Sequence, residues 1–128
     1  MTTILYIEDN DANFVLVKKL LEKSRNYNVI RATNIPDGIK LYKEKKETKI
    51  DLIFVDITLP GESGLDFPAI FSKLLSDDDS LKKVPLIALT ARVMKEDIDE
   101  YKKKGFDDYL GKPFNLSDLW KTIDKYIK

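Results

Sequence analysis

Four short apolar runs of this chain are each followed by residues that could take part in chemistry. In chain order these residues are Glu8-Asp9, Asp56, Thr90 and Lys112. Three carboxylates in one place would repel one another and need a cation. Their hard oxygen ligands favour Mg²⁺, with Mn²⁺ as a substitute, usually shared with waters and a phosphate. If the fold brings these residues together, they are predicted to form a site that binds a phosphate through Mg²⁺.

The other members of the group fit phosphoryl chemistry. Lys112 would place a point charge on a phosphoryl oxygen, and the Thr90 hydroxyl could donate a hydrogen bond to another. One aspartate aligned with the cation could attack phosphorus and form an acyl phosphate. Phosphoryl transfer depends mainly on positioning and charge neutralisation, so it needs no histidine base.

Short apolar runs alternate with longer amphipathic ones, which predicts five strand–helix units. The expected strands cover residues 4–7, 29–30, 52–55, 84–89 and 107–110. The expected helices cover residues 11–25, 34–46, 67–74, 92–104 and 115–127. Gly105 is well placed to cap the fourth helix. The polar segments 60–64 and 76–80 are expected to be loops.

Continuous apolar strands that alternate with helices are typical of a parallel sheet covered on both faces. We therefore expect an α/β fold, a flavodoxin-like doubly wound (βα)5 arrangement with a five-stranded parallel sheet in the order 2-1-3-4-5 and helices on both faces. Ligands of such sheets bind beyond the carboxyl ends of the strands, where the first and third strands are neighbours. The three acids, the hydroxyl and the amine would then converge on one edge.

Each of these residues also has a purely structural interpretation. Asp9 or Asp11 could cap the helix that follows, and Thr90 could do the same for the fourth helix. Lys112 taken alone would be a solvated lysine, and Pro113 would be a helix starter. The informative feature is that different strands deliver complementary groups to one edge.

Composition excludes several classes of chemistry. The 128 residues suit one domain and hold 22 Lys+Arg, 22 Asp+Glu, no His and no Cys. Disulfide scaffolds, cysteine or histidine metal sites and Ser-His-Asp or Cys-His catalysis are therefore excluded. Zero net charge gives no electrostatic footprint for nucleic acid. Because there is neither a signal peptide nor an apolar run of ~18–20 residues, we expect a cytoplasmic protein with no membrane association.

Four spaced motifs carry a resemblance that covers essentially the whole chain. They are Glu8-Asp9-Asn10, Asp56-Ile57-Thr58-Leu59-Pro60 with Gly64, Leu89-Thr90-Ala91, and the segment GFDDYLGKPF at residues 105–114. With these motifs the sequence resembles the receiver domains of two-component response regulators, and in particular the single-domain regulators of the chemotaxis-regulator kind. The resemblance implies one receiver domain over residues 1–128, with no output domain.

The resemblance also implies a role for each matching residue. Asp56 would be the phosphoacceptor. The groups implied to hold Mg²⁺ are Glu8, Asp9, Asp56 and the backbone carbonyl of Thr58. The groups implied to bind the phosphoryl group are Lys112, Thr90 and the backbone of Ala91. The Lys112-Pro113 peptide bond would be cis, and a cis X-Pro bond is a tight-turn device that could fix where the lysine points.

The same resemblance implies a conformational switch and residues that influence the rate of dephosphorylation. Thr90 would reach for the phosphoryl group once Asp56 is modified, and Tyr109 would turn inward with it. Thr58 and Arg92 would modulate access to the phosphoryl group. Neither carries an acid or amide that would position water, so dephosphorylation is expected not to be especially fast.

The implied partners are proteins. A histidine kinase or a histidine phosphotransfer protein would be the donor, since a chain without histidine cannot be its own donor. The output surface would be the face of helix 92–104, strand 107–110 and helix 115–127, which would contact an unknown downstream protein. Met94, Ile98 and Tyr101 are apolar candidates for that contact, although they could equally line the edge of the core. The protein would be a monomer or a phosphorylation-dependent dimer.

Three other functions compete with this interpretation. An aspartate-nucleophile phosphohydrolase would usually have a second carboxylate two residues after the nucleophile, where this chain has Thr58. A flavin or nucleotide carrier would use a glycine-rich phosphate loop, and no such motif occurs. A receiver used only for phosphorylation-independent binding would not need the complete set of acids, threonine and lysine.

Overall fold

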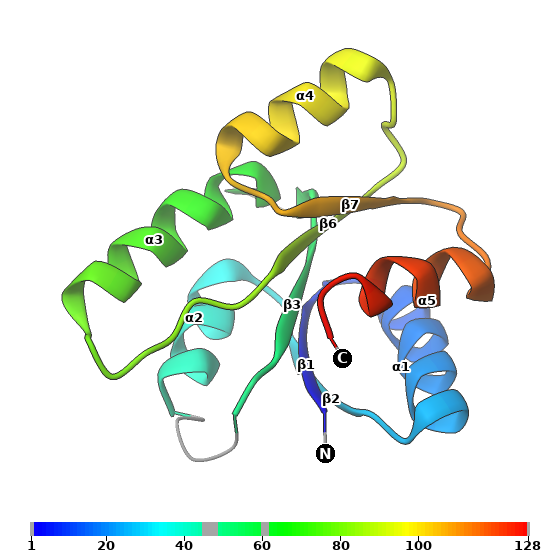
Figure 1. The fold of residues 1–128 in the computed structure, drawn as a ribbon, viewed down its shortest axis with the longest axis horizontal. Coiled ribbons are helices and arrows are strands. Elements are labelled where there is room, and N and C mark those ends of the chain that lie inside the picture. Colours follow the sequence, from blue (N-terminus) through cyan, green and yellow to red (C-terminus); the bar gives the residue numbers. More distant parts are fainter. Residues whose placement is uncertain (1, 45–48, 60–61, 128) are drawn as a thin grey trace.

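The computed structural model describes residues 2–59 and 62–127 apart from 45–48. One sheet contains β1 (Thr3–Ile7), β2 (Asn28–Ala32), β3 (Leu52–Asp56), β6 (Leu86–Thr90) and β7 (Asp108–Gly111). Its order is β2-β1-β3-β6-β7, and every neighbouring pair is parallel (Figure 1). The predicted order 2-1-3-4-5 is confirmed.

Helices cover both faces of the sheet (Figure 1). They are α1 (Asp11–Arg25), α2 (Ile35–Glu44), α3 (Phe67–Asp77), α4 (Lys95–Lys104) and α5 (Leu116–Asp124). A small antiparallel pair, β4 (Thr58–Leu59) and β5 (Glu62–Ser63), follows β3 and leads into a 3₁₀ turn at Gly64–Asp66. The sequence analysis did not predict this pair.

Two apolar cores lie on opposite faces of the sheet because side chains alternate along each strand. In β1, Leu5 and Ile7 belong to the core that also contains residues of α2 and α3. Ile4 and Tyr6 belong to the other core, which contains residues of α1 and α5. Both faces are covered, so the strands are apolar throughout their length except at their ends.

Three helix boundaries differ from the prediction. Helix α4 begins at Lys95 and not at residue 92, because Thr90 Oγ1 accepts a hydrogen bond from the Arg92 amide at 3.0 Å and forms a turn before the helix. Helix α3 continues to Asp77, into the segment expected to be a loop, and Ser76 donates to the Lys73 carbonyl inside it. Helix α5 ends at Asp124 and is followed by a turn. Residues 45 and 46 of the second predicted helix lie outside the described residues.

The ends of two helices follow local chemistry. Asn10 caps α1 by accepting from the Asn13 amide at 2.9 Å, so the cap is neither Asp9 nor Asp11. Gly105 ends α4 with a φ of 115°, a conformation that favours glycine, as predicted.

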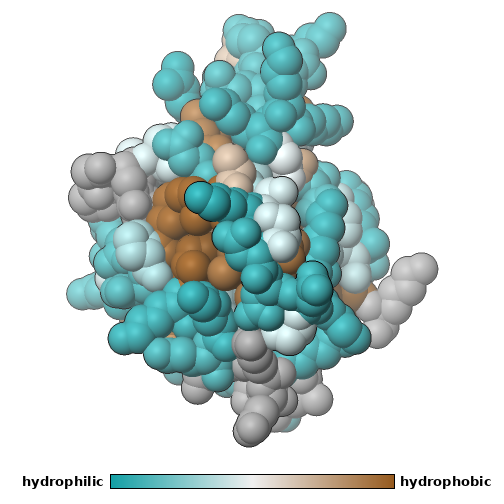
Figure 2. All heavy atoms as spheres, turned by 90° about the vertical axis from the view of Figure 1, so that its left-hand side faces the viewer, coloured by the Kyte–Doolittle hydropathy of each residue, from teal (hydrophilic) through white to brown (hydrophobic). Residues whose placement is uncertain are grey.

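The surface around the sheet is mostly polar. Figure 2 shows the side on which α2 and α3 lie, where apolar side chains form one patch within a hydrophilic surface. The helix that projects above it, α4, is almost entirely hydrophilic in this view. None of the helices in the described part of the chain is both long and apolar enough to span a membrane.

Candidate functional site

The three predicted acids meet at the carboxyl ends of β1 and β3. Ile7 pairs with Val55, so the residues that follow, Glu8 and Asp56, lie side by side. One carboxylate oxygen from each of Glu8, Asp9 and Asp56 lies within 4.8 Å of the others. Glu8 and Asp56 are buried, whereas Asp9 is exposed. The cluster therefore consists of two buried acids, Glu8 and Asp56, and one solvent-exposed acid, Asp9.

Glu8 has no exposed surface and is held from two sides. Its Oε1 accepts a hydrogen bond from the Tyr6 hydroxyl at 2.8 Å and lies 3.4 Å from the Lys112 ammonium. Burial raises the pKa of Glu8, as does the nearby Asp56, while the hydrogen bond from Tyr6 lowers it. Burial and the Glu8 charge also raise the pKa of the Tyr6 hydroxyl, which keeps it a donor.

Asp56 lies at the end of β3 with both carboxylate oxygens partnered. Oδ1 accepts from the Thr58 amide at 2.9 Å, and Oδ2 lies 3.4 Å from Lys112 Nζ. Gly64 passes directly over the backbone of this strand end, where a Cβ would lie 2.2 Å from the Asp56 carbonyl oxygen. Only glycine permits this close approach, which holds the loop after β3 against the site.

Arg31, at the end of β2, holds the acidic loop that follows β1. Its Nε donates to the Glu8 carbonyl and a terminal nitrogen donates to the Asp9 carbonyl, both at 3.1 Å. Its other terminal nitrogen pairs with Asp11 at 2.8 Å, and the guanidinium lies over the Phe14 ring. Arg31 thus fixes the backbone that carries Glu8 and Asp9.

Thr90 is buried at the end of β6, the strand next to β3. Leu89 pairs with Asp56 in the sheet, so Thr90 follows directly after the residue opposite the acid. Its hydroxyl contacts the Tyr101 hydroxyl at 2.8 Å and accepts from the Arg92 amide. In this structure the Thr90 hydroxyl is therefore engaged with α4 and the turn before it.

Lys112 follows β7 and places its ammonium between Glu8 and Asp56. The Lys112-Pro113 peptide bond is cis. Beside the lysine, an apolar pocket is lined by Leu16 and Val17 of α1 and by Ala91, Pro113 and Phe114. Leu16 is 59% exposed, so an apolar surface borders the mouth of the acidic cluster.

The structure places the remaining predicted residues around this centre. Thr58, Ala91 and Arg92 are exposed, and Tyr109 is half-buried against the core that contains Tyr101. Met94 is exposed and Ile98 is half-buried, but Tyr101 is 3% exposed and belongs to the core, so of the two interpretations left open for it the core edge is the correct one.

Two residues that shape the site, Tyr6 and Arg31, were not identified from the sequence, and Tyr101 was considered only for the output surface or the edge of the core. Tyr6 lies in β1 two residues before Glu8, which directly follows the strand, and this spacing places both side chains on one side of the sheet. Arg31 is the last but one residue of β2, the strand beside β1, and Tyr101 lies inside a helix whose other residues are exposed or half-buried. Only the strand spacing of Tyr6 could have been used in advance, since the other two contacts depend on tertiary packing.

The donor set fits Mg²⁺. The cluster offers carboxylate oxygens, and oxygen ligands are those that Mg²⁺ prefers. The described residues bring three acids and one lysine together, so a divalent cation would offset the remaining negative charge. Asp9 is exposed and would keep part of the coordination shell open to water and phosphate.

Comparison with known proteins assigns the family. The family model described as "Response regulator receiver domain" matches residues 4–124. The chain belongs to this family. The polar-differentiation response regulator DivK of Brucella anthropi is 36% identical over 125 residues, which cover 98% of this chain and 95% of DivK.

Two solved structures of receiver domains match the fold and most of its length. One is the complex of the Saccharomyces cerevisiae histidine phosphotransfer protein Ypd1 with the receiver domain of its downstream regulator Ssk1, with a TM-score of 0.83, 29% identity and coverage of 98% of this chain and 88% of that chain. The other is the receiver domain of the Pseudomonas aeruginosa sensor histidine kinase PA1611, which holds a magnesium ion in its active site cleft. It has a TM-score of 0.76 and 26% identity, and the match covers 98% of this chain and 97% of that chain.

Receiver domains are phosphoacceptor signalling domains of two-component phosphorelays and are generally not classed as enzymes. They accept phosphoryl groups from histidine kinases or phosphotransfer proteins, and they bind Mg²⁺ at an acidic site. This receiver domain has an acidic cluster of that kind at Glu8, Asp9 and Asp56.

Proposed function

We propose that this receiver domain accepts a phosphoryl group on Asp56 from a phosphohistidine of a kinase or phosphotransfer protein, in a magnesium-dependent reaction. The observation that carries the proposal is the position of the Asp56 carboxylate, which lies at the carboxyl end of β3 between two further acids and the Lys112 ammonium. Mg²⁺ bound there would neutralise charge on the phosphoryl oxygens. Glu8, Asp9, Asp56 and the Thr58 carbonyl are the proposed groups that hold it.

The transfer is an in-line exchange of bonds at phosphorus. An Asp56 carboxylate oxygen attacks phosphorus, the P–N bond to the donor histidine breaks, and the imidazole nitrogen leaves with the electron pair. Lys112 binds a phosphoryl oxygen as a point charge, and Thr90 with the Ala91 backbone binds the others. Asp56 and Lys112 already lie 3.4 Å apart, so little rearrangement is needed on that side.

The donor protein has an apolar surface to dock on. Val15 and Leu16 on α1 are exposed, and Phe114 and Pro113 lie across the pocket from Leu16. An exposed apolar border beside a polar centre is typical of a protein contact. A phosphohistidine presented over this border would reach the Asp56 carboxylate.

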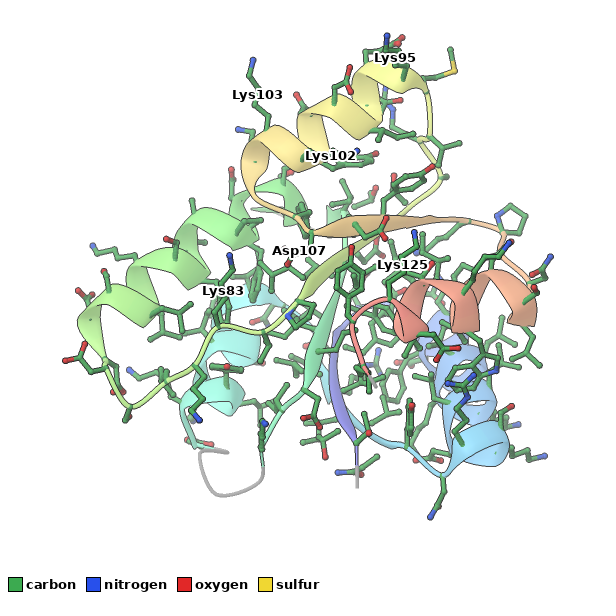
Figure 3. All side chains as sticks on the ribbon, viewed as in Figure 1. Lys83, Lys95, Lys102, Lys103, Asp107 and Lys125 are labelled. Carbon is green, nitrogen blue, oxygen red and sulfur yellow. The ribbon has the colours of Figure 1, made fainter. Side chains whose placement is uncertain are left out.

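The proposed output is a contact of α4, β7 and α5 with a protein partner. In Figure 3, Lys95 and Lys103 point from α4 into solvent, and Lys125 extends toward β7, where it lies 3.2 Å from Asp108. The acids and lysines of this face and the zero net charge favour a protein over nucleic acid. A phosphorylation-dependent dimer through this face stays a prediction.

Slow loss of the phosphoryl group belongs to the same proposal. Thr58 and Arg92 flank the site and are exposed, and neither offers a carboxylate or amide to position a water. A phosphorylated form that lasts only seconds would contradict this part. A phosphohydrolase is not favoured, because Thr58 stands where that class usually has its second acid.

The phosphoacceptor assignment is tested by intact mass. The protein is incubated with Mg²⁺ and acetyl phosphate, and we expect a gain of about 80 Da, the mass of one added phosphoryl group. Asp56→Asn should abolish the gain, whereas Asp51→Asn should retain it, because Asp51 directly precedes the opposite end of β3. No gain on the unmodified chain would contradict the proposal, and rapid turnover of unrelated phosphate esters would point to a hydrolase.

A further inference from the structure

The hydroxyl groups of Thr90 and Tyr101 form a buried pair between the sheet and α4. Tyr101 lies in the last turns of α4, and its hydroxyl is 2.8 Å from Thr90 Oγ1 and 2.7 Å from the Arg92 carbonyl. Both residues are buried, with 4% of Thr90 and 3% of Tyr101 exposed. Water is thus excluded from the pair, so each hydroxyl depends on its protein partners for hydrogen bonds.

The distances to the Arg92 carbonyl give the direction of this pair. That oxygen only accepts, and it lies 2.7 Å from the Tyr101 hydroxyl but 3.5 Å from Thr90 Oγ1, so it takes the Tyr101 proton. The bond between the two hydroxyls is then donated by Thr90. The one proton of the Thr90 hydroxyl is therefore directed to the Tyr101 oxygen, on the α4 side of the strand.

Tyr101 is also the residue that fixes α4 to the rest of the molecule. All ten residues of α4 are described, and Tyr101 is the one that is buried. The other positions on the helix are charged or half-exposed, and Lys95 and Lys103 point into solvent in Figure 3. A change at the Tyr101 hydroxyl thus acts on the main anchor of this helix.

We propose that Tyr101 is a positioning residue that holds the Thr90 proton away from Asp56 in the unphosphorylated domain and transmits its release to α4. The inference rests on the proposed phosphorylation of Asp56. A phosphoryl oxygen is anionic and a stronger acceptor than a neutral tyrosine oxygen, so it draws the Thr90 proton to itself. Tyr101 then keeps its bond to Arg92 and loses its bond to Thr90, which loosens α4.

The test compares tyrosine variants in their affinity for beryllium fluoride, a phosphoryl mimic, in the presence of Mg²⁺. Tyr101→Phe keeps the buried ring and removes the hydroxyl, which is both the acceptor for Thr90 and the donor to the Arg92 carbonyl. Thr90 is left with only the Arg92 carbonyl at 3.5 Å, so its proton is available in advance and the mimic should bind about 3–10-fold more tightly. Backbone amide NMR during the titration gives the affinity. Amide hydrogen exchange in α4 of the unliganded variant should become faster.

Two controls separate this role from a structural one. Tyr126→Phe removes a hydroxyl that bonds to the Asp107 carbonyl and to Asp108 at 3.0 and 3.1 Å, and it should leave the affinity within twofold of the unmodified protein. In a Thr90→Val background, Tyr101→Phe should have no effect, because no proton is left to release.

The outcomes distinguish this inference from the proposed function. Unchanged or weaker binding by Tyr101→Phe, or an equal gain in the Thr90→Val background, would overturn the inference while leaving phosphorylation of Asp56 in place. Failure of the unmodified protein to bind the mimic at all would overturn the proposed function and this inference with it.

Discussion

Glu8 is a buried carboxylate that depends on its neighbours to stay charged. Burial raises its pKa most, and the nearby Asp56 raises it further. The Tyr6 hydroxyl, 2.8 Å away, acts in the opposite sense by donating to the charged form. Since Mg²⁺ binds carboxylates and not carboxylic acids, the Tyr6 hydroxyl would support the proposed magnesium site through Glu8.

We predict that Tyr6→Phe weakens Mg²⁺ binding about 10-fold near neutral pH. The ring still fills the core against Phe14 and Phe54, but the pKa of Glu8 rises further, so more of Glu8 is protonated. Isothermal titration calorimetry measures the affinity. Because a raised pKa favours protonation, the loss should shrink as the pH increases. Tyr27→Phe, in the turn between α1 and β2, is the control, and an equal loss there would contradict the assignment.

Helices α1 and α5 are joined by a second set of contacts, distant from the acidic cluster. Arg25 at the end of α1 donates to both carboxylate oxygens of Asp124, at 2.5 and 3.1 Å. Its guanidinium lies 4.0 Å above the centre of the Trp120 ring. The hydrogen bonds from Arg25 lower the pKa of Asp124. These contacts lock two helices on the same face of the sheet.

The pair of Arg25 and Asp124 makes the stability of the fold depend on pH. A lowered pKa in the folded state means that the unfolded chain binds more protons, so the pair stabilises the fold above the ordinary aspartate value of 3.8 and loses this effect as the pH falls through the lowered pKa. Asp124→Asn should lower the Tm by about 1–3 °C at neutral pH, because the pair is exposed and screened by salt. The difference should shrink as the pH is lowered below the ordinary aspartate value of 3.8 and through the lowered pKa of Asp124. A difference that persists unchanged at low pH, as measured by circular dichroism, would contradict it.

The acidic cluster exists only in the folded molecule, because Glu8 and Asp56 come from separate strands. A cation that binds the folded chain and not the unfolded one stabilises the whole domain by mass action. At ten times its dissociation constant, Mg²⁺ would add about 1.4 kcal/mol to the free energy of unfolding. For a domain of this size that corresponds to about 5 °C in Tm.

For the whole molecule we therefore predict that Mg²⁺ raises the Tm and that Asp9→Asn removes most of the rise. Asp9→Asn should also raise the Tm without Mg²⁺, since it removes one of three mutually repelling carboxylates. Asp11→Asn is the matched control, because Asp11 lies in the adjacent first turn of α1 and pairs with Arg31 outside the cluster. Differential scanning calorimetry with and without MgCl₂ gives both values. An equal magnesium effect in the two variants would contradict the assignment of Asp9.

Apolar runs, helical spacing and polar residues at strand ends are properties of neighbouring residues, and they predicted the elements and the fold class. The strand order came from the known topology of doubly wound sheets, and the convergence of the acids with Lys112 was predicted from that order. Helix boundaries were less accurate. The turn at Thr90–Arg92 delays α4 through a hydrogen bond between side chain and backbone, which competes with the helix and leaves no periodic signal.

The partners of the polar groups became known only from the packing of the folded chain. Tyr6 donates to Glu8, Arg31 holds the loop after β1, and Thr90 is bonded to Tyr101 and not to a group at the acidic cluster. The physical reason is that a buried polar group takes the partner that packing brings within about 3 Å, and residues far apart in the chain meet there without any pattern in the sequence between them.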